Sequence, residues 1–396
     1  MAKQKVVVLG YGFSSRMGIA RALGKAGYNV SVIVIEGVRT RPIDCFSKYV
    51  SHYYYCNGNR EDRLLKILLE NCVEDGQKVI LIPINDFTAT VLDKNYNILK
   101  EHFHLPHIKG EQGAITGWMN KEKQKELARR VGLNVANSID IEIENGVFHI
   151  PSNISYPCFT KTRTFTSGYK QTLQKCEDED ALYNFVKFLS SKHESLTLMV
   201  EDYMEIESEY AVVGFANKNE VTIPGVIEIV KMADGNDKGI ALQGKVMPCS
   251  GFEDLLKMFK EFMKSIGFVG MFDIDFYLCR GKYYFGELNL RIGGSGTAVI
   301  SQGINLPEMF VRTVLGEPIT GMKDEVLETK TYVNERICIE NWYYRYLTSE
   351  QLYTLLRTSE ISFVKDKSDR LPEVFFYLDL GIMFAKRLLK RIMNPL

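Results

Sequence analysis

Three short, strongly apolar runs near the start of this chain constrain its fold more than any other feature. They cover residues 6–9, 30–35 and 79–82, in which Ser31 is the one polar residue, and polar or glycine-containing turns follow them. Strands that are apolar at every position are typical of parallel sheets, which are buried on both faces. Between the first two runs, apolar residues recur with helical spacing before Gly27. This alternation predicts an open parallel α/β sheet.

A glycine pair after the first predicted strand raises the question of dinucleotide binding. Gly10 and Gly12 suit that fingerprint, and Glu36 would be its ribose-binding acid. The fingerprint needs a third glycine where this chain has Ser15. A tight turn in an ordinary parallel domain is therefore favoured over a nicotinamide-dependent oxidoreductase. Alternatively, the start of the following helix, at residues 14–16, would hold an anion.

The charge balance and the cysteines narrow the class of protein. The 49 basic and 49 acidic residues cancel, so we expect no nucleic-acid partner, because such binders usually carry a basic stripe. The eight cysteines stand singly, without a Cys-x-x-Cys pair, which is typical of reduced thiols in a cytoplasmic protein. The first apolar run is too short for a signal peptide, and we expect no membrane-spanning segment.

The most informative segment is a predicted β-hairpin in which polar and apolar residues alternate with a period of two. A loop over residues 280–282 would bring the polar residues of both arms to one face. With three loop residues, Asp275 pairs with Glu287 and Asp273 pairs with Asn289. These polar residues are Asp273 and Asp275 in the first arm, and Glu287, Asn289 and Arg291 in the second.

Several carboxylates and a carboxamide on one face repel one another unless a cation neutralises them. Mg²⁺ takes such oxygen ligands, typically one or two carboxylates together with substrate phosphates. A glycine-rich turn at 293–296 follows Arg291, and its backbone amides could approach an anion closely. We therefore favour a site for metal and phosphate over the alternative, the solvated outer face of an ordinary hairpin.

These motifs, in this order, resemble the ATP-grasp superfamily of ligases, from the first strand to about Gly316. Within it, the chain is similar to the carboxylate–amine ligases that include D-aspartate ligases and carbamoyl-phosphate-synthase-like proteins. Residues 18–24, 46–50 and 303–307 are similar to segments of that branch. The resemblance implies an α/β and α+β fold with an N-terminal open parallel sheet. The implied parts are a pre-ATP-grasp domain at 1–115, a small lobe at 116–200, a large lobe with the metal hairpin at 201–325 and a C-terminal extension at 326–396.

The resemblance also implies roles for single residues. Lys121 matches the first phosphate-binding lysine, with Lys123 and Lys125 as competitors and a solvated helix face as the alternative for all three. Lys161 matches the second lysine. Glu209 matches the acid that accepts the ribose hydroxyls, or else it is an exposed strand acid. The implied nucleotide-binding set is Lys121, Lys161, Ser167, Gly168, Glu201, Asp202, Tyr203, Met204 and Glu209.

The implied metal ligands are Asp275, Glu287 and Asn289, and the implied catalytic residues are Arg291, Lys161 and Glu287. ATP and Mg²⁺ would be the cofactors, with Mn²⁺ as an alternative ion. The expected reaction joins a carboxylate, from an amino acid or dicarboxylate, to an amine through an acyl phosphate, and releases ADP and phosphate. The main rival is an ATP-binding regulator without ligase activity, which the near-complete motif set argues against.

Two further expectations concern partners. The small-molecule carboxylate and amine would lie near Ser14, Ser15, Arg16, Asn85, Asp86, the 293–296 turn, Lys231 and Lys245. A basic amphipathic helix is predicted over residues 380–392. It would rest on a membrane surface or an oligomer partner, or simply pack on its own domain.

Overall fold

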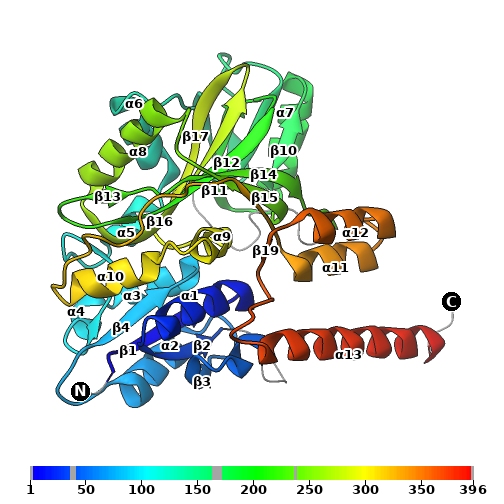
Figure 1. The fold of residues 1–396 in the computed structure, drawn as a ribbon. Coiled ribbons are helices and arrows are strands. Elements are labelled where there is room, and N and C mark those ends of the chain that lie inside the picture. The colour runs from blue at the N-terminus through cyan, green and yellow to red at the C-terminus, as the bar shows by residue number, and fades with distance from the viewer. Residues whose placement is uncertain (1–2, 36–41, 163–171, 236–238, 394–396) are drawn as a thin grey trace. The chain divides into compact units, whose positions relative to one another are not determined.

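The computed structural model describes residues 3–35, 42–162, 172–235 and 239–393 (Figure 1). The chain divides into two compact units. Unit 1 comprises Met1–Thr116, Ala211–Asp273 and Asn289–Leu396. Unit 2 comprises Gly117–Tyr210 and Ile274–Leu288. Glu36, Ser167 and Gly168, which the sequence analysis singled out, lie outside the described residues.

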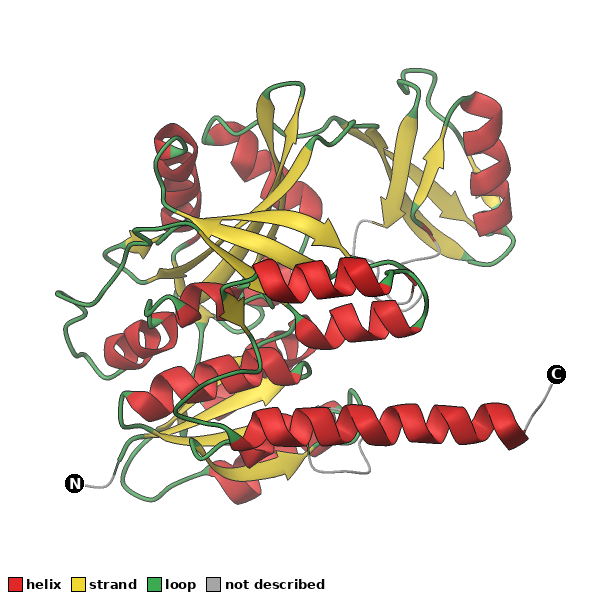
Figure 2. Cartoon of the chain, turned by 45° about the vertical axis from the view of Figure 1, so that its right-hand side comes forward, coloured by secondary structure: helices red, strands yellow, loops and turns green. Residues whose placement is uncertain are grey.

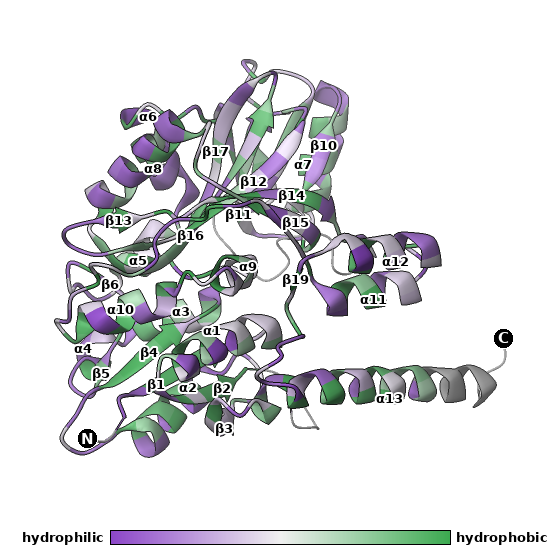
Figure 3. Cartoon of the chain, in the orientation of Figure 1, coloured by the Kyte–Doolittle hydropathy of each residue, from purple (hydrophilic) through white to green (hydrophobic). Residues whose placement is uncertain are grey.

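Unit 1 begins with a five-stranded sheet of order β3-β2-β1-β4-β5, in which every pairing is parallel. The three apolar runs of the sequence form β1, β2 and β4, and Figure 3 colours β4 as hydrophobic. The predicted open parallel sheet is thereby confirmed. Its strands are β1 (Lys5–Gly10), β2 (Asn29–Val34), β3 (Val50–Tyr55), β4 (Val79–Pro83) and β5 (Phe103–His104).

Helices connect these strands, and one of them starts where the site residues are expected. Helix α3 begins directly after β4, and the Asn85 side chain caps it by accepting a hydrogen bond from the backbone N–H of Thr88. Asp86 is therefore fixed in the first turn of α3. The helices of this region are α1 (Phe13–Lys25), the 3₁₀ turn η1 (Ile43–Phe46), α2 (Glu61–Ile67), the π turn η2 (Leu68–Cys72), α3 (Asp86–Lys94), α4 (Tyr96–Leu99) and α5 (Ala114–Trp118).

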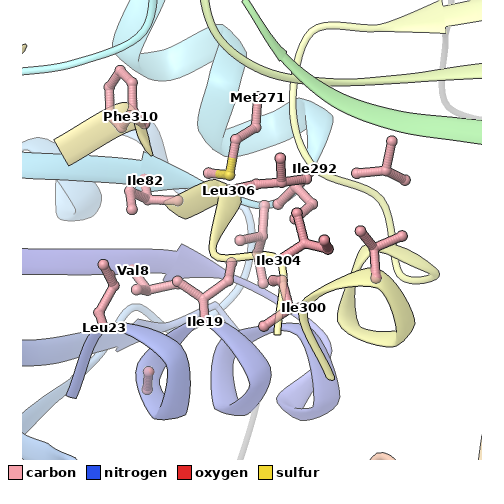
Figure 4. Packing of buried hydrophobic residues seen from close by; sticks show 14 of the residues in the cluster. Val8, Ile19, Leu23, Ile82, Met271, Ile292, Ile300, Ile304, Leu306 and Phe310 are labelled. Atoms are coloured by element: carbon pink, nitrogen blue, oxygen red, sulfur yellow. The ribbon is translucent and has the colours of Figure 1, made fainter. Parts of the chain in front are cut away.

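One apolar core ties the N-terminal sheet to the segment after the hairpin. Ile19 of α1 and Val8 of β1 belong to the same buried cluster as Ile292, Ile304 and Phe310 (Figure 4). Each of these side chains is at most 1% exposed. Because Ile292 follows Arg291 in the chain, this packing fixes the backbone that carries the arginine.

A nine-stranded sheet contains the hairpin. Its order is β17-β16-β12-β14-β15-β18-β19, with β13 paired to β12 and β6 paired to β16. Strands β12, β16 and β17 each contain residues of both units. The strands are β6 (His107–Ile108), β12 (Ser208–Ala216), β13 (Val221–Thr222), β14 (Val226–Met232), β15 (Ala241–Met247), β16 (Phe268–Cys279), β17 (Lys282–Asn289), β18 (Lys330–Val333) and β19 (Ile361–Ser362). The accompanying helices are α8 (Glu253–Ile266), α9 (Gly296–Ser301), α10 (Leu306–Val314), α11 (Glu335–Tyr343) and α12 (Ser349–Thr358).

The C-terminal helix α13 (Leu371–Met393) begins nine residues earlier than predicted (Figures 1 and 2). Pro372 does not prevent this start, because the first turn of a helix needs no backbone N–H donor there. Phe376 and Leu380 pack against Ile43 and Val364 of the same unit, so one face of the helix covers its own domain. No helix within the described ranges is long and apolar enough to cross a membrane.

Unit 2 contains an antiparallel sheet of order β10-β9-β11-β7-β8. Helix α7 begins where the Asp178 carboxylate accepts the backbone N–H of Ala181, and it packs Leu182 and Val186 into the core of this sheet. The elements are α6 (Lys121–Arg130), β7 (Ser138–Glu144), β8 (Val147–Phe148), β9 (Cys158–Thr162), β10 (Gln174–Cys176), α7 (Glu179–Ser190) and β11 (Ser195–Asp202).

Candidate active site

Helix α6 brings Lys121 to the hairpin within unit 2. Asn120 caps the helix by accepting the backbone N–H of Lys123, which fixes Lys121 as the first helical residue. The Lys121 ammonium lies 3.1 Å from Oε2 of Glu287 on β17, and its side chain is only 12% exposed. A residue predicted to contact phosphate therefore forms an ion pair with a predicted metal ligand.

The other two lysines of α6 have different surroundings. Lys123 is exposed, and its ammonium lies 4.2 Å from the centre of the Trp118 ring. Lys125 is buried and forms an ion pair with Oε1 of Glu201 on β11. Burial lowers the pKa of Lys125, although the Glu201 carboxylate opposes that shift.

Glu201 bridges two lysines, which the sequence analysis did not foresee. Its second oxygen lies 2.6 Å from the ammonium of Lys161 on the neighbouring strand β9. Burial opposes ionisation of this carboxyl, but Lys161 and Lys125 outweigh it and lower the pKa of Glu201. The carboxylate is thus held charged between two cations.

Tyr277 of β16 is influenced by four carboxylates, two of which belong to the hairpin. Burial is the first cause that raises the pKa of Tyr277 well above 10. Nearby negative charges add to the shift, because an anionic phenolate is costly beside carboxylates. In decreasing order, these charges belong to Asp275, Glu209, Glu287 and Glu201. The sequence analysis missed Tyr277, although it has the same parity along the first arm as Asp275.

The hairpin loop is shorter than predicted. Only Arg280 and Gly281 separate β16 from β17, and both have positive φ, at 49° and 69°. Such two-residue turns match the twist of paired strands. The expectation of a loop over 280–282 was therefore wrong.

With a two-residue turn, strict alternation would place Asp275 and Glu287 on opposite faces. Alternation in β17 is interrupted, however, since Phe285 and Leu288 are both buried although they are three residues apart. β17 therefore departs from strict alternation between residues 285 and 288. Asp275 and Glu287 both contribute to the raised pKa of Tyr277.

Gln124 of α6 holds the backbone of β17 at Leu288. Its side-chain amide donates to the carbonyl of Leu288 at 3.0 Å and accepts from the N–H of Leu288 at 2.9 Å. Gln124 is 2% exposed. This pair of bonds fixes the backbone next to Glu287. Sequence reasoning missed Gln124, because a glutamine on a polar helix gives no signal of a buried contact with a distant strand.

The segment expected to bind the nucleoside follows β11. Asp202 ends this strand, and Oδ2 of its carboxylate accepts a hydrogen bond from the Asn137 side chain at 2.8 Å. Tyr203 is 40% exposed, with the Lys175 ammonium 4.2 Å from its ring centre. Met204 is half-buried. Burial raises the pKa of Glu209, which is half-buried rather than an exposed strand acid.

Unit 1 contributes Arg291, which is held by two acceptors. Its Nε donates to Oδ1 of Asp86 at 2.9 Å, and its terminal nitrogen Nη2 lies 3.3 Å from both Oδ2 of Asp86 and Oδ1 of Asn289. The Asp86 contact is bidentate, and such a fork orients a guanidinium firmly. The predicted residues Asp86, Asn289 and Arg291 are thus brought together.

Arg16 does not face a ligand as the sequence analysis expected. Its side chain is fully buried. The Nε atom donates to Asp44 at 2.7 Å, and Nη1 donates to the carbonyl of Gly10 at 2.5 Å. A buried arginine needs such partners, so Arg16 stabilises the turn after β1 and is not available to an incoming anion.

The donor set for a metal ion is small. No group of three or more His, Cys, Asp and Glu side chains in the described part of the chain forms a metal site by itself. Within unit 2, the predicted metal ligands Asp275 and Glu287 offer two carboxylates. This set suits Mg²⁺ only if phosphate oxygens complete the coordination. In nucleotide sites, Mg²⁺ is commonly bound by one or two carboxylates together with substrate phosphates.

Comparison with known proteins agrees with this arrangement. The family model of the ATP-grasp domain matches residues 126–305. The formate-dependent phosphoribosylglycinamide formyltransferase of Bacteroides thetaiotaomicron is 25% identical over 264 residues, which are 65% of this chain and 66% of that enzyme. The chain therefore spans just under two thirds of the length of that relative.

Solved structures show the same fold. The N5-carboxyaminoimidazole synthetase of Staphylococcus aureus, complexed with ADP, superposes with a TM-score of 0.61 at 17% identity, covering 83% of this chain and 81% of that one. The biotin carboxylase domain of the Hydrogenobacter thermophilus 2-oxoglutarate carboxylase, in complex with MgADP, gives 0.64 at 18% identity, covering 83% and 73%. The predicted fold class is confirmed, and residues 126–305 are similar to the ATP-grasp domain, which the order of the motifs indicated.

Proposed function

We propose that this protein is an ATP-dependent ligase that joins a carboxylate to an amine through an acyl phosphate and releases ADP and phosphate. The observation that carries the proposal is the pairing of Lys121 with Glu287 and of Lys161 with Glu201 within one unit. Each cation is held in place by an acid. Polyphosphate oxygens can displace these carboxylates from the lysines or bind the lysines beside them, because phosphates and carboxylates accept the same charge-assisted hydrogen bonds.

The roles of the other residues follow from the family resemblance and from their surroundings. We assign Lys121 and Lys161 to the phosphates of ATP. The segment from Glu201 to Met204 would contact the adenine, and Glu209 would accept the ribose hydroxyls. Ser167 and Gly168 remain proposed phosphate-loop residues on sequence grounds alone.

Asp275, Glu287 and Asn289 fit a divalent cation. Burial first, and then charges that include those of Asp275 and Glu287, raise the pKa of Tyr277, so the negative charge of both carboxylates acts on this phenol. A bound Mg²⁺ would neutralise that charge together with the charge of the phosphates, and it would polarise the phosphoryl group for transfer. Mn²⁺ is the alternative ion, because it accepts similar oxygen ligands.

A free carboxylate is a poor electrophile, so it must be activated before an amine can attack it. Transfer of the γ-phosphoryl group to a carboxylate oxygen breaks the bond to the β-phosphate and gives an acyl phosphate and ADP. An amine then attacks the carbonyl carbon, and inorganic phosphate leaves. Lys121 and Lys161 hold the phosphates in line, which supplies most of the catalysis in phosphoryl transfer.

Arg291 would act on the second half of the reaction. Its guanidinium, oriented by Asp86, would stabilise the oxyanion that forms when the amine attacks. Asn85 and the turn at 293–296 are further candidates for contact with the carboxylate substrate. Lys245 is a weaker one, because it already lies 3.5 Å from the Glu228 carboxylate. Lys231 stays a candidate on sequence grounds.

The test is release of ADP and phosphate from ATP·Mg²⁺ in the presence of candidate substrates. The panel contains formate, amino acids including D-aspartate, and dicarboxylates, each with and without a second amine. Release that requires one carboxylate and one amine, and that disappears in Glu287→Gln, supports the ligase.

The matched control is Glu142→Gln, which changes an exposed carboxylate of the same unit that accepts a hydrogen bond from Thr197. This variant should keep the activity. Tight ATP binding without release on any substrate would favour the regulator instead. Because the chain retains the proposed phosphate-binding lysines and metal-binding acids, we favour the ligase over the regulator.

We also propose a cytoplasmic location, because all eight cysteines are free thiols. The exposed face of α13 carries Val374, Leu378 and Ile382, and we propose it as the contact with a membrane surface or an oligomer partner. Removing residues 380–396 should abolish liposome binding in the first case and lower the oligomeric mass in the second. No effect on either would leave α13 as a covering helix of unit 1.

A further inference from the structure

Two cysteines face each other across adjacent strands of unit 2. Cys158 opens β9 and Cys176 ends β10, and the register of this antiparallel pair places them directly opposite each other. Directly opposed residues in antiparallel strands have Cα atoms about 4.5 or 5.5 Å apart. Both separations lie within the range that a disulfide spans, about 4.4 to 6.8 Å.

The two thiols already interact. Both side chains are fully buried, and they share the core of unit 2 with Leu182 and Val186 of α7. The hydrogen bond between the thiols raises the pKa of Cys158 and lowers the pKa of Cys176. The two thiols are therefore within hydrogen-bonding reach of each other.

We propose that Cys158 and Cys176 form a redox modification site, at which hydrogen peroxide converts the two thiols into an intrachain disulfide. The reaction has two steps. The Cys176 sulfur attacks one peroxide oxygen, which breaks the O–O bond, gives a sulfenic acid and releases water. The Cys158 sulfur then attacks the sulfur of that sulfenic acid, which forms the S–S bond and expels a second water. The thiols lose two electrons and two protons, and the peroxide receives them.

Access to the buried pair is provided by the edge of the sheet. Strand β10 has only three residues and lies at the edge of the five-stranded sheet. Short edge strands open locally far more readily than central ones. Peroxide is small enough to reach Cys176 during such an opening, whereas Cys158 on β9 lies between β10 and β11.

The bridge would tie the edge strand to its neighbour. It would close the segment between residues 158 and 176, which carries Lys161. A crosslink of this kind lowers the entropy of the unfolded chain and stabilises the folded unit. We expect a higher melting temperature in the oxidised protein, which dithiothreitol reverses.

The experiment treats the full chain with hydrogen peroxide, alkylates the remaining thiols and maps the peptides by mass spectrometry without reduction. The expected result is one crosslinked peptide pair containing Cys158 and Cys176, with two of the eight thiols lost. Cys249 is the internal control, because it is the one cysteine that is not buried. Unpaired oxidation of Cys249 before any change at Cys158 and Cys176, or a bridge between other cysteines, would overturn the proposal.

Single cysteine variants test whether this bridge causes both the crosslink and the shift in melting temperature. Cys176→Ala should remove the crosslink and the shift in melting temperature, whereas Cys249→Ala should retain both. If Cys176→Ala does not fold, Cys158→Ala gives the same test from the other side. If neither folds, the wild-type peptide map decides. Persistence of the thermal shift in a folded single variant would contradict the proposed bridge.

Discussion

The Lys161 ammonium lies 2.6 Å from Oε2 of Glu201, and the other oxygen of this carboxylate pairs with Lys125. One acid therefore pairs with two lysines from different elements, a strand and a helix. Because Lys125 is only 3% exposed, the charge of this lysine depends on Glu201. The triad links the stability of unit 2 to a residue that is proposed to contact nucleotide.

Glu201→Gln should destabilise the protein by about 3 kcal/mol, because removing one partner leaves a buried lysine without its counter-charge. Urea denaturation measures this loss. The double variant Glu201→Gln with Lys125→Met should recover part of it, since the buried cation is then absent. Equal stability of Glu201→Gln and the wild type would show that the triad contributes nothing to folding.

Lys121→Met should weaken ATP binding about tenfold or more, since a charge-assisted hydrogen bond contributes about 1.5 to 3 kcal/mol. Titration calorimetry with an ATP analogue measures the affinity. The matched control is Lys123→Met on the same helix, whose exposed side chain lies over Trp118. Equal losses in the two variants would reject Lys121 as the phosphate-binding lysine.

The sequence predicts the parts of this fold that local patterns encode. Strongly apolar runs predicted the parallel sheet correctly. The hairpin loop was predicted wrongly, because neither the positive φ of Arg280 nor the broken alternation of β17 can be recognised in a period-two sequence pattern. The bond from Gln124 to Leu288 joins residues 164 positions apart, so it depends on tertiary packing alone.

The same limit applies to the candidate site. Lys121, Lys161 and Glu287 stand at positions that motifs mark, and their catalytic roles stay predictions. The burial of Arg16 against Asp44 could not be anticipated, because the sequence of a helix start that contains serine and arginine does not indicate whether the arginine is exposed or buried. Tyr277 was missed for the opposite reason, since an aromatic residue in a strand usually indicates only packing.

Asp366 should give unit 1 a dependence on acid pH. Its pKa is lowered to about 2, because hydrogen bonds from Lys25 and Ser368 outweigh the opposing effect of burial. The stabilisation is therefore complete above the ordinary pKa of 3.8 and is lost as the pH falls towards about 2. Lys25 is 46% exposed, so solvent screening limits the contribution to about 1 kcal/mol.

The measurement for Asp366 compares the unfolding of Asp366→Asn and the wild type between pH 7 and pH 2. The difference in stability should be constant at the higher pH values and should shrink below about pH 4. Asp75→Asn, at an exposed turn, is the control and should show no such trend. A difference that grows as the pH falls would contradict the assigned shift.

Arg291→Lys should lower kcat about a hundredfold while the affinity for ATP changes little. Lysine cannot form the bidentate contact with Asp86, so its charge would not be held in the orientation that Arg291 has. A residue that stabilises the developing oxyanion affects the transition state more than the bound nucleotide. The control is Arg312→Lys, which changes an arginine of the same unit paired with Glu308 on helix α10. It should retain wild-type turnover. A matching rise in the Kd for ATP with unchanged kcat would instead assign Arg291 to nucleotide binding.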